Sequence, residues 1–276
     1  MPMTKVREYH RPETIDQALK LLARADIDTA PMGGGTHVSQ QSGVQPEAVV
    51  DLSALPLSYI ARDGAFLRIG ALTRLHEISQ DPALRGFAGG LVAEAARLSD
   101  SSLLRNQATL AGTILSPTGV ELVSALLVLD AQVQLQSAAG PATRHISQIE
   151  PESCRRAILT EVILPEPPSG WRTRRERISR TPSDRPILSI TAIALIIDGS
   201  ISGCRIAVAG SELHPIRLRN LESALAGTPG RSEIIDAACS KDATLIDMQG
   251  SGAEYRRAMI PVLISRAVLG SSCRQR

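Results

Sequence analysis

The sequence predicts a mixed α+β protein built from at least two parts. Its 276 residues, 43% of them hydrophobic, are enough for two or three subdomains with a sizeable core. Stretches with apolar residues at helical spacing alternate with short apolar runs that are typical of strands. Prolines at positions 165, 167 and 168 then mark a boundary, because proline cannot donate to a strand ladder and stiffens a linker.

The first quarter of the chain predicts a β-α-β-like opening. Thr14 as an N-cap, Gln17 three residues later and apolar residues at helical spacing predict a helix over about residues 14–24. A short strand then leads into three glycines, and residues 47–53 predict a second strand. Farther along, residues 67–69 predict a strand, and a helix is expected to begin near Thr73.

The middle of the chain predicts a helix over residues 91–97, followed by a polar, small-residue stretch that reads as a loop. A helix over about residues 121–129 and an alternating strand over 132–136 follow. Beyond the prolines, two apolar strand-like stretches and two helical ones predict a small α+β domain with helices packed on an antiparallel sheet.

Charge and cysteine content exclude several classes of protein. The net charge of +2 is too balanced for a nucleic-acid partner or an anionic membrane surface. No apolar leader opens the chain and no stretch approaches the roughly 18 apolar residues of a spanning helix, so we expect a cytoplasmic protein. Neither the histidines nor the cysteines have metal-ligand spacing, so no metal or iron–sulfur site is expected. The cysteines read as isolated buried thiols: Cys154, Cys204, Cys239 and Cys273.

One arginine-rich stretch, "WRTRRER" at residues 171–177, stands out from this balance. The favoured interpretation is a solvated face, since isolated surface charge contributes little to stability or binding. The alternative is docking of an acidic partner subunit or of a dinucleotide phosphate.

Two small-residue stretches could carry chemistry. The first is "GGGTHVS", in which a glycine turn either serves chain geometry alone or offers successive N–H groups to an anion, with the hydroxyls of Thr36 and Ser39 beside them. Neither a helical pattern nor a lysine follows, so it is not a Rossmann or P-loop motif. The second, "LLRNQATLAGTILSP", supplies Thr109, Gly112 and Ser116 and would let a bulky ligand lie against the backbone.

Motifs along nearly the whole chain occur in the order found in one known family. They are "PMGGGTHV", "VVDLS", "LRIGALTRLHEI", "LRNQATLAGTILSP", "SALLVLDAQVQL", "LTEVILP", "RISRTPSD", "RIAVAG", "PIRLRNLESALAG" and "EYRRAMIPVLISRAV". The chain thus resembles the FAD-binding medium subunits of molybdenum hydroxylases, the group that includes carbon monoxide dehydrogenase and xanthine dehydrogenase. The resemblance implies a two-lobed FAD-binding fold of the vanillyl-alcohol-oxidase (PCMH) type over residues 1–167, with lobes of about 1–55 and 56–167. It also implies a domain like the carbon monoxide dehydrogenase flavoprotein C-terminal domain over residues 170–276.

The function implied by the resemblance is electron transfer. FAD would lie between the lobes, take electrons from iron–sulfur clusters on a small partner subunit and pass them to an acceptor such as NAD. A large molybdopterin subunit would oxidise the substrate. The protein's own contribution would be to bind, orient and tune the cofactor.

The resemblance also implies a cofactor-binding set. Its members are Met32, Gly33, Gly34, Gly35, Thr36, His37, Val38, Ser39, Thr109, Ala111, Gly112, Thr113, Ser116, Glu121, Leu164 and Glu176.

Five of these positions depart from the family pattern. His37 stands where an acidic residue is usual, and Ala111 and Thr113 replace a glycine and an asparagine. Glu121 is a displaced stand-in for the acid that holds the ribose or adenine end of FAD, and Glu176 replaces a lysine beside the flavin ring. Two alternatives therefore stay open: a homologue that has lost FAD and serves as a scaffold or binds another small ligand in the vacated cleft, and a stand-alone flavoenzyme recruited to a biosynthetic pathway.

Overall fold

A computed structural model describes residues 6–36, 46–117, 119–150, 154–181, 184–210, 213–242, 245 and 252–270. Its contacts group the chain into two compact units. The first unit comprises Met1–Asp81, Ala96–Gly119 and Asp130–Pro165. The second unit comprises Pro82–Ala95, Val120–Leu129 and Glu166–Arg276, so two segments from the middle of the chain pack with its C-terminal part.

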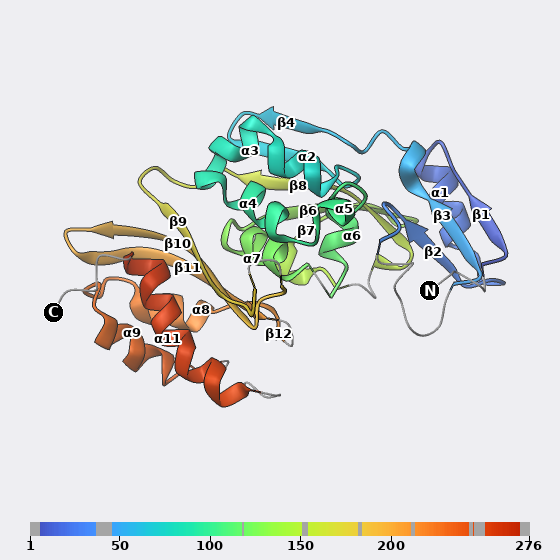
Figure 1. Ribbon diagram of the computed structural model, residues 1–276. Helices are drawn as coiled ribbons and strands as arrows, with labels where there is room; N and C mark the ends of the chain where they lie inside the picture. The colour runs from blue at the N-terminus through green and yellow to red at the C-terminus, as the bar shows by residue number, and fades with distance from the viewer. Residues whose placement is uncertain are drawn as a thin grey trace. The chain divides into compact units, whose positions relative to one another are not determined.

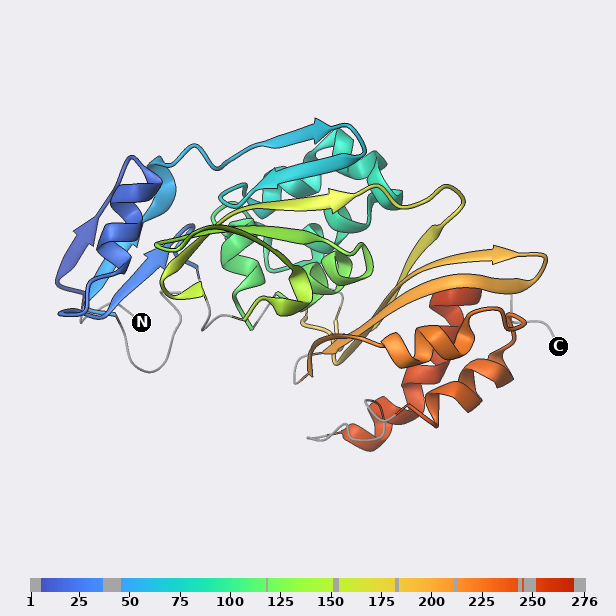
Figure 2. The ribbon, with the colours of Figure 1, turned by 180° about the vertical axis from the view of Figure 1, so that it is seen from behind.

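The first unit begins with a three-stranded parallel sheet in the order β1-β3-β2. The strands are β1 (Glu8–His10), β2 (Thr29–Met32) and β3 (Ala48–Asp51), and helix α1 (Ile15–Leu22) lies against them (Figures 1 and 2). The predicted helix start is confirmed, because Thr14 and Gln17 form a reciprocal capping box. The buried face of α1, which includes Ala18 and Leu22, packs in a core cluster with Val50.

An antiparallel sheet of five strands completes the first unit, in the order β4-β5-β8-β6-β7. Its strands are β4 (Ile60–Asp63), β5 (Phe66–Gly70), β6 (Gln132–Ser137), β7 (Gly140–His145) and β8 (Ala157–Pro165). The short helices of this unit are α2 (Leu75–Gln80), α5 (Ser102–Arg105) and α6 (Leu110–Ile114). The strands predicted at 67–69 and 132–136 are confirmed, as is the helix beginning near Thr73.

The second unit is built on an antiparallel sheet in the order β12-β11-β10-β9. Its strands are β9 (Arg172–Ile178), β10 (Leu188–Ile197), β11 (Ser200–Gly210) and β12 (Leu213–Arg217). Helices α8 (Arg219–Leu225), α9 (Ser232–Cys239) and α11 (Ala253–Leu269) cover one face of this sheet (Figures 1 and 2). Their core contains Ile190 and Ile206 of the sheet and Ile264 of α11, which confirms the predicted small α+β domain.

Helix α7 (Val120–Val128) lies on the opposite face of that sheet, in the same unit as α3 (Pro82–Gly86) and most of α4 (Leu91–Leu98). Arg205 of β11 donates to the carbonyl of Val128, and its neighbour Ile206 points to the other face, because side chains alternate along a strand. All of α7 except Val123 is buried, as expected of a helix that is apolar on every side. The helix predicted over 121–129 is thus confirmed.

Two further features bear on the sequence expectations. No helix in the described ranges combines the length and apolar character needed to cross a membrane. Cys154, Cys204 and Cys239 are buried thiols outside any disulfide, as predicted, whereas Cys273 lies outside the described residues.

Candidate functional site

The glycine turn after β2 packs directly on the start of the second small-residue stretch. A Cβ on Gly33 would lie 2.6 Å from Oγ1 of Thr109, and a Cβ on Gly34 would collide with the backbone carbonyl of Gln107. Gly35 has a φ of 72°, in the left-handed region that favours glycine. All three glycines are therefore required by local packing or backbone conformation, and the two predicted segments lie side by side.

The same turn leaves backbone donors free. Within the described part of the chain, the N–H groups of Gly34 and Gly35 have no hydrogen-bond acceptor. Gly33 to Thr36 are all partly exposed, so these donors lie at the surface of the first unit. Adjacent N–H groups in such a turn form a concave donor site that suits an anion such as a phosphate.

The second small-residue stretch was expected to be a loop, and that expectation is wrong. Thr109 caps the short helix α6, its Oγ1 accepting from the N–H of Gly112 at 3.3 Å. The first N–H groups of α6 are also occupied, since Leu110 donates to the Thr73 carbonyl and Ala111 to that of Ala71. A Ser/Thr residue followed by apolar and small residues is as good a helix start as a loop, and tertiary contacts favour the helix here.

The hydroxyls of α6 differ in what they can offer a ligand. Thr113, which stands in place of the family's asparagine, is buried and its hydroxyl donates to the Thr109 carbonyl at 2.8 Å. Thr109 is similarly buried, but its hydroxyl proton has no acceptor in the described ranges and its oxygen faces Gly33. Thr109 is therefore the side chain that can add a donor to those of the glycine turn, whereas Thr113 serves the helix.

A partly buried hydrogen-bonded network, with Thr73 and Glu161 buried, supports this corner of the first unit. Thr73, whose carbonyl receives the Leu110 N–H, also uses its hydroxyl to bond both the N–H (3.1 Å) and the carbonyl (3.0 Å) of Tyr59. The Tyr59 phenol donates to Glu161 at 2.8 Å, and Glu161 pairs with Arg68 at 2.6 Å. Burial, and next the hydrogen bond to Glu161, raise the pKa of Tyr59 to about 12.

Glu121 is engaged within the second unit, which argues against its expected role at the ribose or adenine end of FAD. Its side chain is 3% exposed on α7. Oε2 accepts from the hydroxyl of Ser189 at 3.0 Å and lies 3.5 Å from Nη1 of Arg175, and Oε1 lies 3.4 Å from Nε of Arg177. The carboxylate already has three partners and little solvent access.

The arginine-rich stretch forms strand β9, and its two faces differ. Arg175 is 5% exposed and Arg177 is 17% exposed, so the expected fully solvated face is wrong for these two residues. Arg172 and Arg174 are exposed, in agreement with it. Glu176 pairs with Ile190 and points to the sheet face opposite Arg175 and Arg177.

The remaining residues of the expected cofactor-binding set lie in different parts of the first unit or outside the described residues. Met32 ends β2 beside Gly35, and Ala111, Gly112 and Ser116 are partly exposed in or just after α6. Leu164 of β8 is fully buried and pairs with Leu67 of β5. His37, Val38 and Ser39 lie outside the described residues. Residue type could not indicate the roles of Gln107, Ala71 and Thr73, because these residues contribute backbone carbonyls that do not depend on the side chain.

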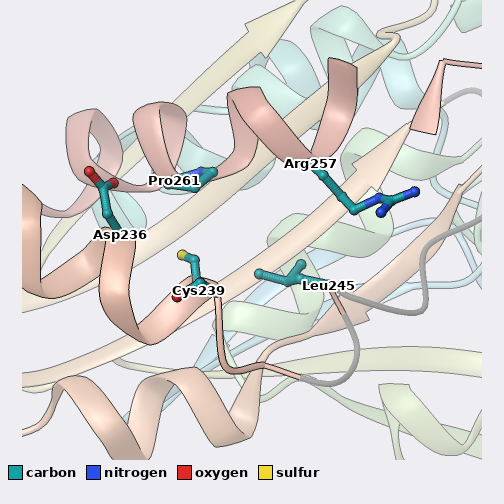
Figure 3. Close-up of a pocket in the computed structure, with 6 residues that line it drawn as sticks. Asp236, Cys239, Leu245, Arg257 and Pro261 are labelled. Atoms are coloured by element: carbon teal, nitrogen blue, oxygen red, sulfur yellow. The ribbon is translucent and has the colours of Figure 1, made fainter. Parts of the chain in front are cut away.

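A separate cavity of about 240 Å³ lies between α9 and α11 of the second unit. Cys239 and Leu245 lie across from Pro261, with Asp236 and Arg257 to either side (Figure 3). Burial, and next the charge of Asp236, raise the pKa of the Cys239 thiol to about 12, so this sulfur is no nucleophile at neutral pH. None of the expected site residues lines this cavity.

Comparison with known proteins gives matches over nearly the whole chain. Residues 4–167 match the family described as the FAD binding domain in molybdopterin dehydrogenase. Residues 176–271 match the carbon monoxide dehydrogenase flavoprotein C-terminal domain.

Individual relatives also match over nearly the full length of this chain. The chain is 29% identical to the nicotine 6-hydroxylase medium subunit of Paenarthrobacter nicotinovorans, with 96% of this chain and 97% of that protein covered. It is 23% identical to the carbon monoxide dehydrogenase medium chain of Hydrogenophaga pseudoflava, with 95% of each covered. A solved carbon monoxide dehydrogenase from the latter organism has the same fold, with a TM-score of 0.85 at 24% identity over 97% of both chains.

Proposed function

Because the chain belongs to the family of FAD-binding subunits of molybdopterin dehydrogenases, we propose that it carries electrons through FAD within a larger oxidoreductase. The electrons would come from iron–sulfur clusters of a small partner subunit, and a large molybdopterin subunit would oxidise the substrate. The relatives are named medium subunits or medium chains, which supports an assembly of this kind. FAD supplies the redox chemistry when bound, and this chain supplies its binding and orientation.

The observation that carries the proposal is the donor set at the glycine turn. The free N–H groups of Gly34 and Gly35 and the hydroxyl of Thr109 suit the anionic diphosphate of FAD. Met32, Gly33 and Thr36 complete this first group, and Ala111, Gly112 and Ser116 would form the adjacent wall. We leave Thr113, Glu121 and Glu176 out of the contact set, because the first two are buried in internal hydrogen bonds and the third lies on the sheet face that carries α11.

The decisive experiment is an absorbance spectrum of the purified chain before and after incubation with FAD. We expect flavin bands that survive desalting. A chain that stays colourless after incubation with FAD would refute FAD binding and favour the scaffold alternative. The same spectrum of the Gly34→Ala variant tests the site itself, and this variant should retain less flavin because the substitution perturbs the turn.

The partner and acceptor parts of the proposal need their own measurements. Affinity capture from the native organism should recover an iron–sulfur protein and a molybdopterin protein, whereas flavin binding without any partner would favour a stand-alone flavoenzyme. NAD is our proposed acceptor, and reduced holoprotein should then be reoxidised by added NAD in a stopped-flow trace at the flavin band. Reoxidation by quinone or dye but not by NAD would remove NAD from the proposal.

A further inference from the structure

The turn between β5 and α2, residues 70–75, is hydrogen-bonded on both of its sides. On one side, the N–H of Gly70 donates to the carbonyl of Tyr59, directly before β4, at 2.9 Å. On the other side, the carbonyls of Ala71 and Thr73 accept from the first two N–H groups of α6, at 2.9 Å each. The 70–75 turn therefore connects the start of β4 to the start of α6, and all of these residues belong to the first unit.

The 70–75 turn also touches the glycine turn. A Cβ on Gly33 would lie 3.4 Å from Cδ2 of Leu72, in addition to its close approach to Oγ1 of Thr109. Leu72 is buried and packs in the same core cluster as α1. Both halves of the proposed donor set, the glycine turn and the Thr109 hydroxyl, thus rest on the 70–75 turn.

Thr73 is the side chain that fixes the 70–75 turn. It is 2% exposed, and its hydroxyl accepts from the N–H of Tyr59 at 3.1 Å and donates to the Tyr59 carbonyl at 3.0 Å. The N–H of Thr73 closes the turn by donating to the Gly70 carbonyl at 3.1 Å. Removing a buried hydroxyl with two backbone partners is costly, because the N–H left behind loses its acceptor. The bonds between backbone groups do not depend on residue type, whereas the bonds of this hydroxyl do.

We propose that Thr73 is a positioning residue for FAD. Its hydroxyl fixes the 70–75 turn against Tyr59, and this turn holds the start of α6, and with it the Thr109 hydroxyl, beside the glycine turn. Thr73 acts on FAD through the position of these donors and makes no contact of its own with the cofactor. The support of α6 stands on the contacts alone, and only the effect on FAD rests on the proposed function.

The test uses the full chain and four variants. Thr73→Val keeps the side-chain shape and removes the hydroxyl, whereas Thr73→Ser keeps the hydroxyl and tests rescue. Thr14→Val is the matched control, because it removes a hydroxyl that caps α1 by accepting from the Gln17 N–H at 3.2 Å and that has no printed bond to the 70–75 turn or α6 among the described residues. Thr73→Ala, with a smaller side chain that fits without strain, serves if Thr73→Val does not fold.

Three measurements separate stability, local support and cofactor binding. Circular dichroism gives the unfolding midpoint of each apoprotein. Hydrogen exchange with mass spectrometry gives the exchange rate of the backbone amides in the 108–115 segment, which contains the start of α6. Flavin fluorescence titration gives the Kd for FAD at a temperature where every variant is folded.

We expect Thr73→Val and Thr14→Val both to lower the midpoint, by roughly 5 °C and roughly 3 °C. Only Thr73→Val should speed amide exchange in the 108–115 segment, by about tenfold, and raise the Kd for FAD, also by about tenfold. Thr73→Ser should bring both values back to within about threefold of those of the unsubstituted chain. Thr73→Ala should show the same pattern as Thr73→Val.

Four results would overturn the proposal. An unaltered Kd for FAD despite faster exchange would show that the support of α6 does not set affinity. Weaker FAD binding without faster exchange would show that Thr73 acts by another route. An equal rise of the Kd in Thr14→Val would attribute the effect to stability alone, and a serine variant as weak as the valine variant would show that the hydroxyl is not the active group. If the unsubstituted chain binds no FAD, the proposed function fails, while the exchange rates still decide whether Thr73 supports α6.

Discussion

The contact between Gly34 and Gln107 makes Gly34→Ala the sharpest perturbation of the proposed site. The new methyl group would collide with a backbone carbonyl, which cannot rotate away as a side chain could. Either the turn or the 107–109 segment must move, and overpacking of this kind costs about 1–3 kcal/mol. For a protein of this size that corresponds to a midpoint lowered by about 2–12 °C.

Gly34→Ala should weaken FAD binding more than its modest loss of stability would imply. The turn carries the free N–H groups, so displacing it removes donors from the positions that fit a diphosphate. Loss of about 2 kcal/mol of binding energy would weaken FAD binding by roughly thirtyfold. Flavin fluorescence titration measures the Kd, and circular dichroism measures the midpoint.

Gly86→Ala is the matched control for this variant. Gly86 has a φ of −84°, and a Cβ there would meet nothing within 4 Å. The same glycine-to-alanine change should therefore leave FAD binding unaltered and stability unchanged or slightly higher, by up to about 1 kcal/mol. If Gly34→Ala matched Gly86→Ala in both assays, the close packing of the two segments would be refuted.

Two further predictions follow from the same corner of the first unit. Thr109→Val keeps the side-chain shape but removes the hydroxyl that caps α6, so the free energy of unfolding should fall by about 1 kcal/mol and the Kd for FAD should rise about fivefold. Thr109→Ser keeps the hydroxyl and should restore both values. A valine variant with unaltered affinity for FAD would exclude this hydroxyl from the site. Tyr59 has a pKa of about 12 in the folded chain against an ordinary value of 10, so the unfolded chain loses this proton at lower pH and the free energy of unfolding should decline as pH rises from about 10 to 12. Urea unfolding over this pH range should show a shallower decline for Tyr59→Phe than for the unsubstituted chain. The same decline in both proteins would contradict the raised pKa of Tyr59.

Local signals in the sequence were sufficient for most elements of the fold. The capping pair Thr14 and Gln17 marked the start of α1, and alternating apolar residues marked β6, because both patterns depend on neighbours in the chain. The placement of α7 could not be predicted in this way. Its partners, β10 to β12, lie about 60 to 95 residues later, and an apolar helix carries no record of which sheet it packs on.

The candidate site was predictable in outline but not in its contacts. The glycine turn and the 109–116 stretch are adjacent as the resemblance implied, yet the contact that joins them is made by a backbone carbonyl at Gln107. Residue type carries no information about such a contact. Likewise, an acid near position 121 looks the same in sequence whether it faces a ligand or two arginines on a strand more than 50 residues away.

The placement of α7 has a consequence for how this protein can be divided. From the bounds of the family match alone, cleavage or truncation at the prolines after β8 is expected to release an intact FAD-binding fragment. That fragment would instead expose the apolar sides of α7 and separate the Glu121 carboxylate from Arg175, Arg177 and Ser189, since the sheet belongs to the other piece. The two family domains therefore have separate sequence boundaries but depend on each other to fold. During synthesis, the apolar surface of α7 stays exposed until the C-terminal sheet has been made and has folded.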